Sequence, residues 1–265
     1  MNILQEIAAR TEERINEKKK VIPPETIIKM ADLNSRGGQN CPPGYPFEKM
    51  LCRDDIAFIC EIKKASPSKG VITEHFPYLD IAKDYEAAGA AAISVLTEPF
   101  YFLGDDAYLR EIADTAAIPV LRKDFTVDSY MIYEAKVLGA SAVLLICSIL
   151  GKETLAEYIG IADSLGLSAL IETHSEDEVD MALKAGARII GVNNRNLKTF
   201  EVDLTLSERL RKIVPRDVIF VSESGINSPE DIEKLREIGA NAVLIGEAIM
   251  RSIDKKAEIL RLRGV

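Results

Sequence analysis

The chain has 265 residues, of which 47% are hydrophobic and 28% are charged, and its formal net charge at pH 7 is -9. This length suits one large α/β domain or two small ones, and the hydrophobic content allows a sizeable core. A nucleic-acid binder would more often be basic, so that class is disfavoured, and an anion would have to be bound locally by a few Lys, Arg and backbone N–H groups.

No stretch approaches ~18 uninterrupted apolar residues, so no membrane span is expected. Residues 1–20 hold four glutamates and lack the apolar centre of a signal peptide, and we therefore expect a cytoplasmic protein. The four cysteines show no CxxC spacing and there are only two histidines, which argues against a Cys/His zinc site. Cys147 follows an apolar run and is most simply a small core residue. No metal, cofactor or obligatory protein partner is expected.

The chain begins with a region that differs from the rest. Residues 2–20 are expected to be helical, residues 23–30 form a second short helix with prolines at its start, and the Gly-, Pro- and Asn-rich residues 34–47 form a loop. We expect residues 1–50 to be a helical extension packed on the main domain. No linker is long enough to argue for a further domain.

From residue 51 onward, a short aliphatic run, a polar turn and an amphipathic helical stretch recur. The strand-like runs are residues 56–63, 91–97, 119–123, 142–147, 169–173, 189–193, 218–223 and 242–246. The helix-like segments are residues 79–88, 108–116, 129–138, 152–165, 176–185, 205–213 and 229–238, and Gly-Ala pairs follow four of them as expected of helix C-caps. Alternating elements imply a parallel sheet, and eight units in about 200 residues predict a closed (β/α)₈ TIM barrel over residues 51–265. An open doubly wound sheet is disfavoured because no Gly-rich dinucleotide motif follows the first strand.

The first predicted strand ends in an unusual pair of charges. Glu61 and Lys63 share one face of this strand because side chains alternate along it. Two charges at the end of an apolar strand are costly to desolvate unless something uses them. The Ser-Pro-Ser-Lys-Gly sequence that follows cannot continue a central strand and predicts a turn.

Ionisable or amide side chains also end other predicted strands. With Glu61 and Lys63 they make five such ends, the others being Lys123 and Asp124, Glu172, Asn193 and Arg195, and Glu223; the eighth strand ends at Gly246, which Glu247 follows. One charged strand end is often only the place where a chain reaches water. Five of eight ends at the same register are harder to dismiss, because barrel active sites form at the carboxyl ends of the strands. Glutamates near the lysines are expected to keep them protonated and able to act as acids.

An anion site is predicted in the loops after the seventh and eighth strands, where barrels often bind phosphate. Gly225 and Gly246 lie in these loops and would let backbone N–H groups approach an anion. Either glycine alone would be an ordinary turn residue, but both in the two expected loops favour phosphate. Lys63, next to the eighth strand around the ring, would supply formal charge.

Together these segments resemble indole-3-glycerol phosphate synthase, the ring-closing decarboxylase of tryptophan biosynthesis. The matching runs occur in the family's order and are EIKKASPSKG (61–70), SVLTE (94–98), LRKDF (121–125), LIE (170–172), GVNNRNL (191–197), VSESGI (221–226) and LIGEA (244–248). Each short run is weak alone, but the full set is highly specific.

The resemblance implies a small phosphorylated substrate, 1-(2-carboxyphenylamino)-1-deoxyribulose 5-phosphate, converted to indole-3-glycerol phosphate, CO₂ and water without a cofactor. By position, Lys123 matches the general acid for ring closure, and Glu172 matches the general base of the later dehydration. Lys63 matches a substrate-contacting lysine that has been argued to be a second acid, and Glu61 pairs with these lysines.

The resemblance also implies binding roles along the substrate. Asn193 and Ser224 match groups that hold the ribulose-derived chain, and Arg195 matches a group near the anthranilate carboxylate. Glu223 matches a polar residue that orients its neighbours. Ser66 would lie at the substrate's edge.

The two ends of the substrate have their own matches. Phe102 and Phe125 would line the aromatic part of the site. Gly225, Gly246 and Glu247 match the family's phosphate pocket, to which Glu247 would contribute its backbone N–H and not its carboxylate.

Two alternatives stay open from the residues themselves. The first is another phosphate-binding barrel enzyme, such as an isomerase of the same pathway or a Schiff-base aldolase using Lys123. The second is a non-catalytic phosphosugar-binding barrel. The opposed lysines and glutamates argue against the second, because binding alone would not require so many opposed charges in one cavity.

Overall fold

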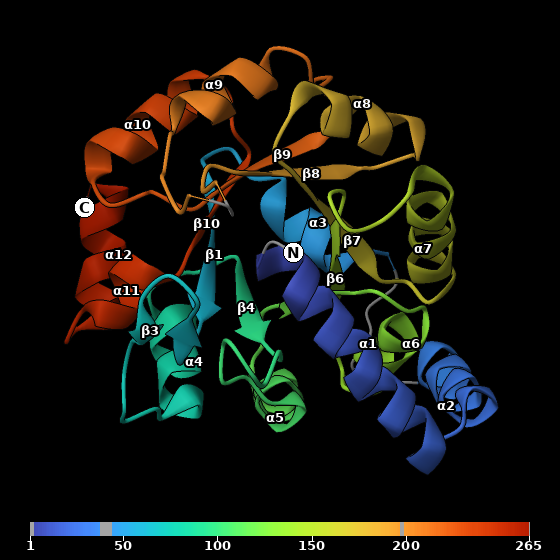
Figure 1. The fold of residues 1–265 in the computed structure, drawn as a ribbon. Helices are drawn as coiled ribbons and strands as arrows, with labels where there is room; N and C mark the ends of the chain where they lie inside the picture. The colour runs from blue at the N-terminus through green and yellow to red at the C-terminus, as the bar shows by residue number, and fades with distance from the viewer. Residues whose placement is uncertain (1–2, 38–43, 197–198, 265) are drawn as a thin grey trace.

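The computed structural model describes residues 3–37, 44–196 and 199–264 of the chain. Its centre is a closed barrel of eight parallel strands (Figure 1). The strands are β1 (Ala57–Ile62), β4 (Ala92–Leu96), β5 (Val120–Lys123), β6 (Ala142–Ile146), β7 (Ser168–Thr173), β8 (Ile189–Asn193), β9 (Ile219–Glu223) and β10 (Ala242–Ile245). The ring closes because β1 pairs with both β4 and β10. The predicted TIM barrel is confirmed, and each strand lies within one residue of the predicted run at either end.

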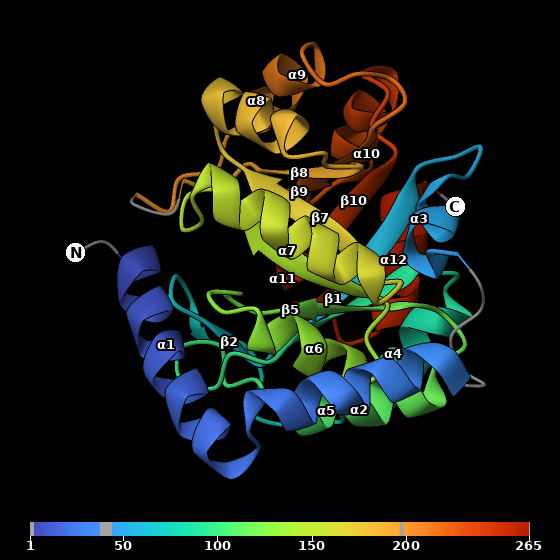
Figure 2. The same cartoon turned by 90° about the vertical axis from the view of Figure 1, so that its right-hand side faces the viewer.

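Helices surround the barrel on the outside (Figures 1 and 2). They are α4 (Tyr78–Ala87), α5 (Asp106–Thr115), α6 (Tyr130–Val137), α7 (Lys152–Ser164), α8 (Glu176–Lys184), α9 (Thr205–Arg211), α10 (Pro229–Glu237), α11 (Glu247–Arg251) and α12 (Lys255–Arg263). The seven predicted helices are confirmed, and the expected C-cap glycines Gly89, Gly139, Gly186 and Gly239 all have left-handed φ angles of 77–90°. The sequence did not predict α11, which has only five residues, or α12. None of the helices within the described residues is long and apolar enough to cross a membrane.

The described residues before the barrel form the helices α1 (Ile3–Val21), α2 (Pro24–Gly37) and α3 (Pro46–Leu51). The predicted loop over residues 34–47 was wrong at both ends, since α2 runs to Gly37 and α3 begins at Pro46. The reason lies in packing: Phe47 and Leu51, four residues apart on one helical face, are fully buried. Residues 38–43, which include Cys41, lie outside the described part.

The two ends of the barrel are covered differently. At the amino ends of the strands, Phe47 and Leu51 of α3 pack into the barrel interior. Glu48 of α3 accepts hydrogen bonds from Ser168 at the start of β7 and from Arg188 just before β8. At the carboxyl ends α1 crosses the opening, with its amino-terminal end near the barrel centre in Figure 1.

Helix α1 is fixed there by a buried ion pair. Arg14 donates to both carboxylate oxygens of Asp124, at 2.9 and 2.8 Å, and to the carbonyl of Thr97. Asp124 directly follows the last residue of β5 and is 1% exposed. The helix is therefore fastened next to the strand end that carries Lys123.

The barrel interior is filled by alternate side chains of the strands. Leu121, Leu170 and Val221 belong to this inner cluster. Lys123, Glu172 and Glu223 come two residues later on the same faces, so their side chains lie above the apolar interior. The parity of the strands thus delivers charged groups to the carboxyl end of the barrel.

Candidate active site

A cavity of about 430 Å³ opens at the carboxyl ends of the strands, within the size range of small-molecule sites. Every residue predicted to form the site lines it, although they come from seven separate segments of the chain. These residues are Glu61, Lys63, Ser66, Phe102, Lys123, Phe125, Glu172, Asn193, Arg195, Glu223, Ser224, Gly225, Gly246 and Glu247. Leu197, at the end of one of the matching runs, lies outside the described residues.

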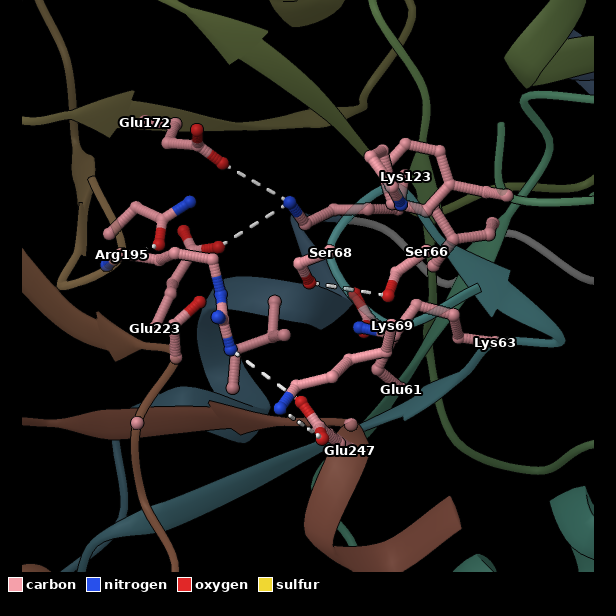
Figure 3. Close-up of a pocket in the computed structure, with 18 of the residues that line it drawn as sticks. Glu61, Lys63, Ser66, Ser68, Lys69, Lys123, Glu172, Arg195, Glu223 and Glu247 are labelled. Carbon is pink, nitrogen blue, oxygen red and sulfur yellow. Dashed lines mark hydrogen bonds and ion pairs between the residues drawn. The ribbon is translucent and has the colours of Figure 1, made fainter. Parts of the chain in front are cut away.

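Lys123 lies between two carboxylates (Figure 3). Its Nζ donates to Oε2 of Glu172 at 3.1 Å and lies 3.5 Å from Oε2 of Glu223. Burial alone would lower the pKa of Lys123, but the charges of Glu172, Glu223 and Glu61 outweigh it and raise the pKa above its usual value. The side chain is therefore an ammonium ion that carries the proton a general acid needs.

The two carboxylates beside Lys123 differ in proton affinity. Burial raises the pKa of Glu172, but the charges of Lys123 and His174 more than offset it, so the pKa is lowered. For Glu223 burial dominates, and Lys123 only partly offsets it, so the pKa rises to about 7. Oε1 of Glu223 also has no hydrogen-bond partner within the described part of the chain. Glu172 is thus the ionised carboxylate of the pair, which suits a base.

Two glycines make room for carboxylates in the barrel. A Cβ on Gly246 would lie 2.3 Å from Oε2 of Glu61, and a Cβ on Gly191 would lie 2.2 Å from Oε1 of Glu223. Both distances are far shorter than real Cβ contacts, so any larger residue would displace a carboxylate. Oε2 of Glu61 forms an ion pair with Lys63. Gly246 therefore shapes the acid–base site as well as the neighbouring loop, and the sequence had assigned no role to Gly191.

The loops after β9 and β10 form a concave backbone surface. Ser224 and Gly225 are consecutive residues with left-handed φ angles of 67° and 82°. That conformation is rare for a serine, and such backbone strain clusters at binding sites. Successive backbone N–H groups in such conformations bind anions.

Cations from two other loops reach the same region. Arg195 and Lys69 lie 3.6 and 3.7 Å from the two carboxylate oxygens of Glu247. Lys69 lies between β2 (Ala65–Ser66) and β3 (Gly70–Val71), which pair as a short antiparallel hairpin after β1. The sequence had not singled out Lys69, because its partner lies in a loop distant along the chain.

An apolar wall faces the lysines. The rings of Phe102 and Phe125 lie with their centroids 6.0 Å apart. Ile3, Leu4 and Ile7 of α1 complete the wall. The sequence predicted α1 as a helix packed on the barrel but did not predict that it lines the site.

Glu98 holds this wall in place. It is fully buried, and its carboxylate accepts the backbone N–H groups of Phe100, Tyr101 and Phe102 at 2.9, 2.7 and 3.0 Å. The carbonyl of Phe102 in turn accepts the N–H of Ala65 at 3.1 Å. One carboxylate therefore links the apolar wall to the loop after β1.

Cys147 does not enter the site. Its side chain is buried and its Sγ lies 3.7 Å from the carbonyl oxygen of Glu178. Burial raises the pKa of this thiol to about 12, so it stays protonated and unreactive.

The cavity therefore combines three regions. The Lys123 ammonium ion and the Glu172 carboxylate are in contact, the left-handed turn of Ser224 and Gly225 lines the cavity, and so do the rings of Phe102 and Phe125. This arrangement suits acid–base chemistry on a flexible molecule with an aromatic ring at one end and an anionic group at the other.

Comparison with known proteins gives concordant matches. The family profile described as "Indole-3-glycerol phosphate synthase" matches residues 4–262. Curated proteins with the same description are 59% identical over 262 residues in Ruminiclostridium cellulolyticum and 51% identical over 269 residues in Lachnoclostridium phytofermentans, each match covering 99% of both chains.

Solved structures with low sequence identity share only the fold. A 3-hexulose-6-phosphate synthase from Salmonella typhimurium has a TM-score of 0.65 at 13% identity, covering 79% of this chain and 97% of its own. The tryptophan synthase α-subunit from Pyrococcus furiosus has a TM-score of 0.61 at 16% identity, covering 80% and 99%. At these identities the likeness supports the barrel architecture and nothing finer.

Proposed function

The chain belongs to the indole-3-glycerol phosphate synthase family, and from this premise we propose how the residues of its cavity carry the reaction. The protein is a carboxy-lyase of tryptophan biosynthesis. It converts 1-(2-carboxyphenylamino)-1-deoxyribulose 5-phosphate to indole-3-glycerol phosphate, CO₂ and water. The burial, charges and contacts of the cavity residues support the roles proposed for them.

The first task is to bring the two ends of a flexible substrate together. In the proposal the phosphate is bound by the backbone of Ser224, Gly225 and Gly246 with Lys63 nearby, and the anthranilate ring lies against Phe102 and Phe125. Arg195 pairs with the anthranilate carboxylate. Fixing both ends places the ring carbon next to the ketone, and such positioning can supply ~7–11 kcal/mol of the barrier.

Ring closure then needs a proton. The aryl carbon that bears the carboxylate attacks the ketone, and negative charge develops on the ketone oxygen. Lys123 donates to that oxygen, which its protonated state and its central position support. A well-placed general acid contributes ~10²–10⁴ in rate. Loss of CO₂ returns the bonding electrons to the ring and restores its aromaticity.

Dehydration completes the indole. The hydroxyl formed from the ketone leaves as water after protonation by Lys63 or Lys123, and the new ring loses one proton to a base. Glu172 is that base, because it is the carboxylate that is ionised and lies in hydrogen-bond contact with the acid. Asn193 holds the sugar-derived chain, Glu223 orients Lys123, Ser66 lies at the substrate's edge, and Glu247 contributes its backbone N–H to the phosphate.

The observation that carries these roles is the contact of Lys123 with Glu172, at 3.1 Å, inside a cavity that is also lined by Gly225 and Gly246. The test is the appearance of indole fluorescence when the purified protein is mixed with the proposed substrate. Glu172→Gln should impair turnover with little effect on the fold, and normal product formation by this variant would remove Glu172 as the base. Borohydride in the presence of substrate should trap no lysine adduct, whereas an adduct on Lys123 would favour Schiff-base chemistry.

Three broader expectations belong to the proposal as well. Residues 51–265 would form the catalytic domain, with residues 1–50 as an extension packed on it. The protein would act in the cytoplasm. It would need no other protein for activity.

A further inference from the structure

His174 lies beside the proposed base and has no role in the mechanism above. It follows the last residue of β7, two residues after Glu172. Its Nε2 is 3.5 Å from Oε1 of Glu172, and its Nδ1 is 3.4 Å from Oε2 of Glu178. The side chain is 19% exposed, and Nε2 is buried without a hydrogen-bond partner among the residues that the structure describes.

The first turn of α8 contacts the imidazole on its Nδ1 side, away from Glu172. Oε2 of Glu178 accepts the backbone N–H of His174 at 2.6 Å. Glu178 is itself fixed because its backbone N–H donates to the side chain of Ser175, the N-cap of the helix. A strand end, a tight turn and a helix start therefore fix the direction in which Nε2 points.

Glu172 is consequently contacted on both oxygens by different groups. Oε2 accepts a hydrogen bond from Lys123, and Oε1 faces Nε2 of His174. A carboxylate approached from two sides by cations has little freedom to rotate. It is also favoured in its ionised form.

The charges that face His174 come from several elements. Glu172 on β7 and Glu178 on α8 lie within 3.5 Å of the imidazole, and Glu223 on β9 adds negative charge once it ionises. Lys123 on β5 is the positive group that contacts Glu172 from the other side, and Cys147 after β6 is a neutral thiol next to Glu178. Burial lowers the pKa of His174, but the hydrogen bond with Glu178 and the three carboxylate charges outweigh burial and raise the pKa. The imidazole thus gains its positive charge at a higher pH than a free histidine does.

We propose that His174 is a positioning residue that orients Glu172 through Oε1 and keeps it ionised, while Glu178 holds the imidazole. The inference rests on the proposed role of Glu172 as the base. It makes the proton affinity of Glu172 depend on a second group, the imidazole of His174, whose charge changes with pH at far lower pH than that of Lys123.

The test compares His174→Gln with the wild type across pH. Removing the imidazolium should move the acid limb of the kcat profile to higher pH, because Glu172 then takes up a proton more readily. The kcat should also fall ~10–100-fold through loss of orientation, while KM and the affinity for inorganic phosphate stay within about twofold, since His174 does not line the cavity. His75→Gln changes the other histidine of the chain, which is exposed, and should leave the profile unchanged.

A second variant separates positioning from a merely structural role. Glu178→Gln keeps an acceptor for the backbone of His174 but removes a charge that raises the imidazole pKa. His174 should then lose its proton at a lower pH, and the alkaline fall in kcat that follows this deprotonation should begin at a lower pH than in the wild type.

Two outcomes would overturn the inference. An acid limb that stays in place in His174→Gln shows that the imidazole does not govern Glu172. A fall in kcat that accompanies a lowered melting temperature, with no change in either limb, assigns His174 to the fold alone. Both differ from failure of the proposed function itself, which would appear as normal turnover in Glu172→Gln.

Discussion

Replacing Lys123 by methionine tests the centre of the mechanism. Methionine has a similar length but carries no charge. In the folded protein Nζ of Lys123 lies 3.1 Å from one carboxylate and 3.5 Å from the other. At an effective dielectric constant of about 20, each of these pairs is worth about 5 kcal/mol. Without the ammonium ion, Glu172 and Glu223 lose their largest stabilising charge, so their pKa values rise and they take up protons.

The variant therefore loses more than its acid. The proposed base also becomes protonated, so Lys123→Met and Glu172→Gln should disable the same unit. We expect kcat of Lys123→Met to fall by at least ~10²–10⁴, the range for a general acid. The double variant should be no more than ~10-fold slower than the slower single variant, because residues that act as one unit are strongly non-additive.

The assay is the initial rate of indole fluorescence at saturating substrate for the wild type, both single variants and the double variant. Circular dichroism and the Kd for inorganic phosphate serve as controls, since the phosphate is proposed to bind the backbone of Ser224, Gly225 and Gly246 and not the side chain of Lys123. Near-normal kcat in Lys123→Met would refute its role as the acid. Losses that multiply in the double variant would refute the coupling of acid and base.

Three further predictions follow from single contacts. Burial raises the pKa of Glu223 from 4.5 to about 7, so the folded state holds a proton that the unfolded state releases, and the free energy of unfolding should fall as pH rises from about 4.5 to about 7. Urea unfolding of Glu223→Gln should show a flatter dependence of this free energy on pH over that window. A dependence equal to that of the wild type would contradict the raised pKa. Gly246→Ala places a Cβ 2.3 Å from Oε2 of Glu61 and should lower kcat because that carboxylate is displaced. The matched control is Gly151→Ala, which should stay active because no atom lies within 4 Å of the added Cβ. Glu247→Gln removes a carboxylate whose Oε1 lies 3.7 Å from Nζ of Lys69 and frees this cation to attract an anion at the neighbouring loop. Calorimetry should then find tighter binding of inorganic phosphate, and weaker binding would show that the carboxylate supports the site.

The barrel and the bounds of most of its strands and helices could be predicted from the sequence because they depend on local patterns. Eight short aliphatic runs and their intervening helices set the barrel, and alternation along each strand decided that Glu61, Lys123, Glu172 and Glu223 would share its carboxyl end. Left-handed glycines such as Gly139 mark the helix ends by a backbone preference that belongs to the residue itself. Helix α3 escaped detection because its stability comes from burying Phe47 and Leu51 in the barrel, which the surrounding prolines and glycines conceal.

By itself, then, the sequence determined the barrel, the register of its strand ends and the identity of the charged groups there. The tertiary structure alone decided which of these groups touch and how they share protons. Glu172 and Glu223 are chemically identical side chains at equivalent positions, yet burial against different partners lowers the pKa of one and raises that of the other. The sequence indicated no role for four further residues, because each contacts a residue that is distant along the chain or lies across a turn: His174, Lys69, Gly191 and Glu98. Electrostatic energy depends on distance and burial, and neither exists until the strands close into a ring.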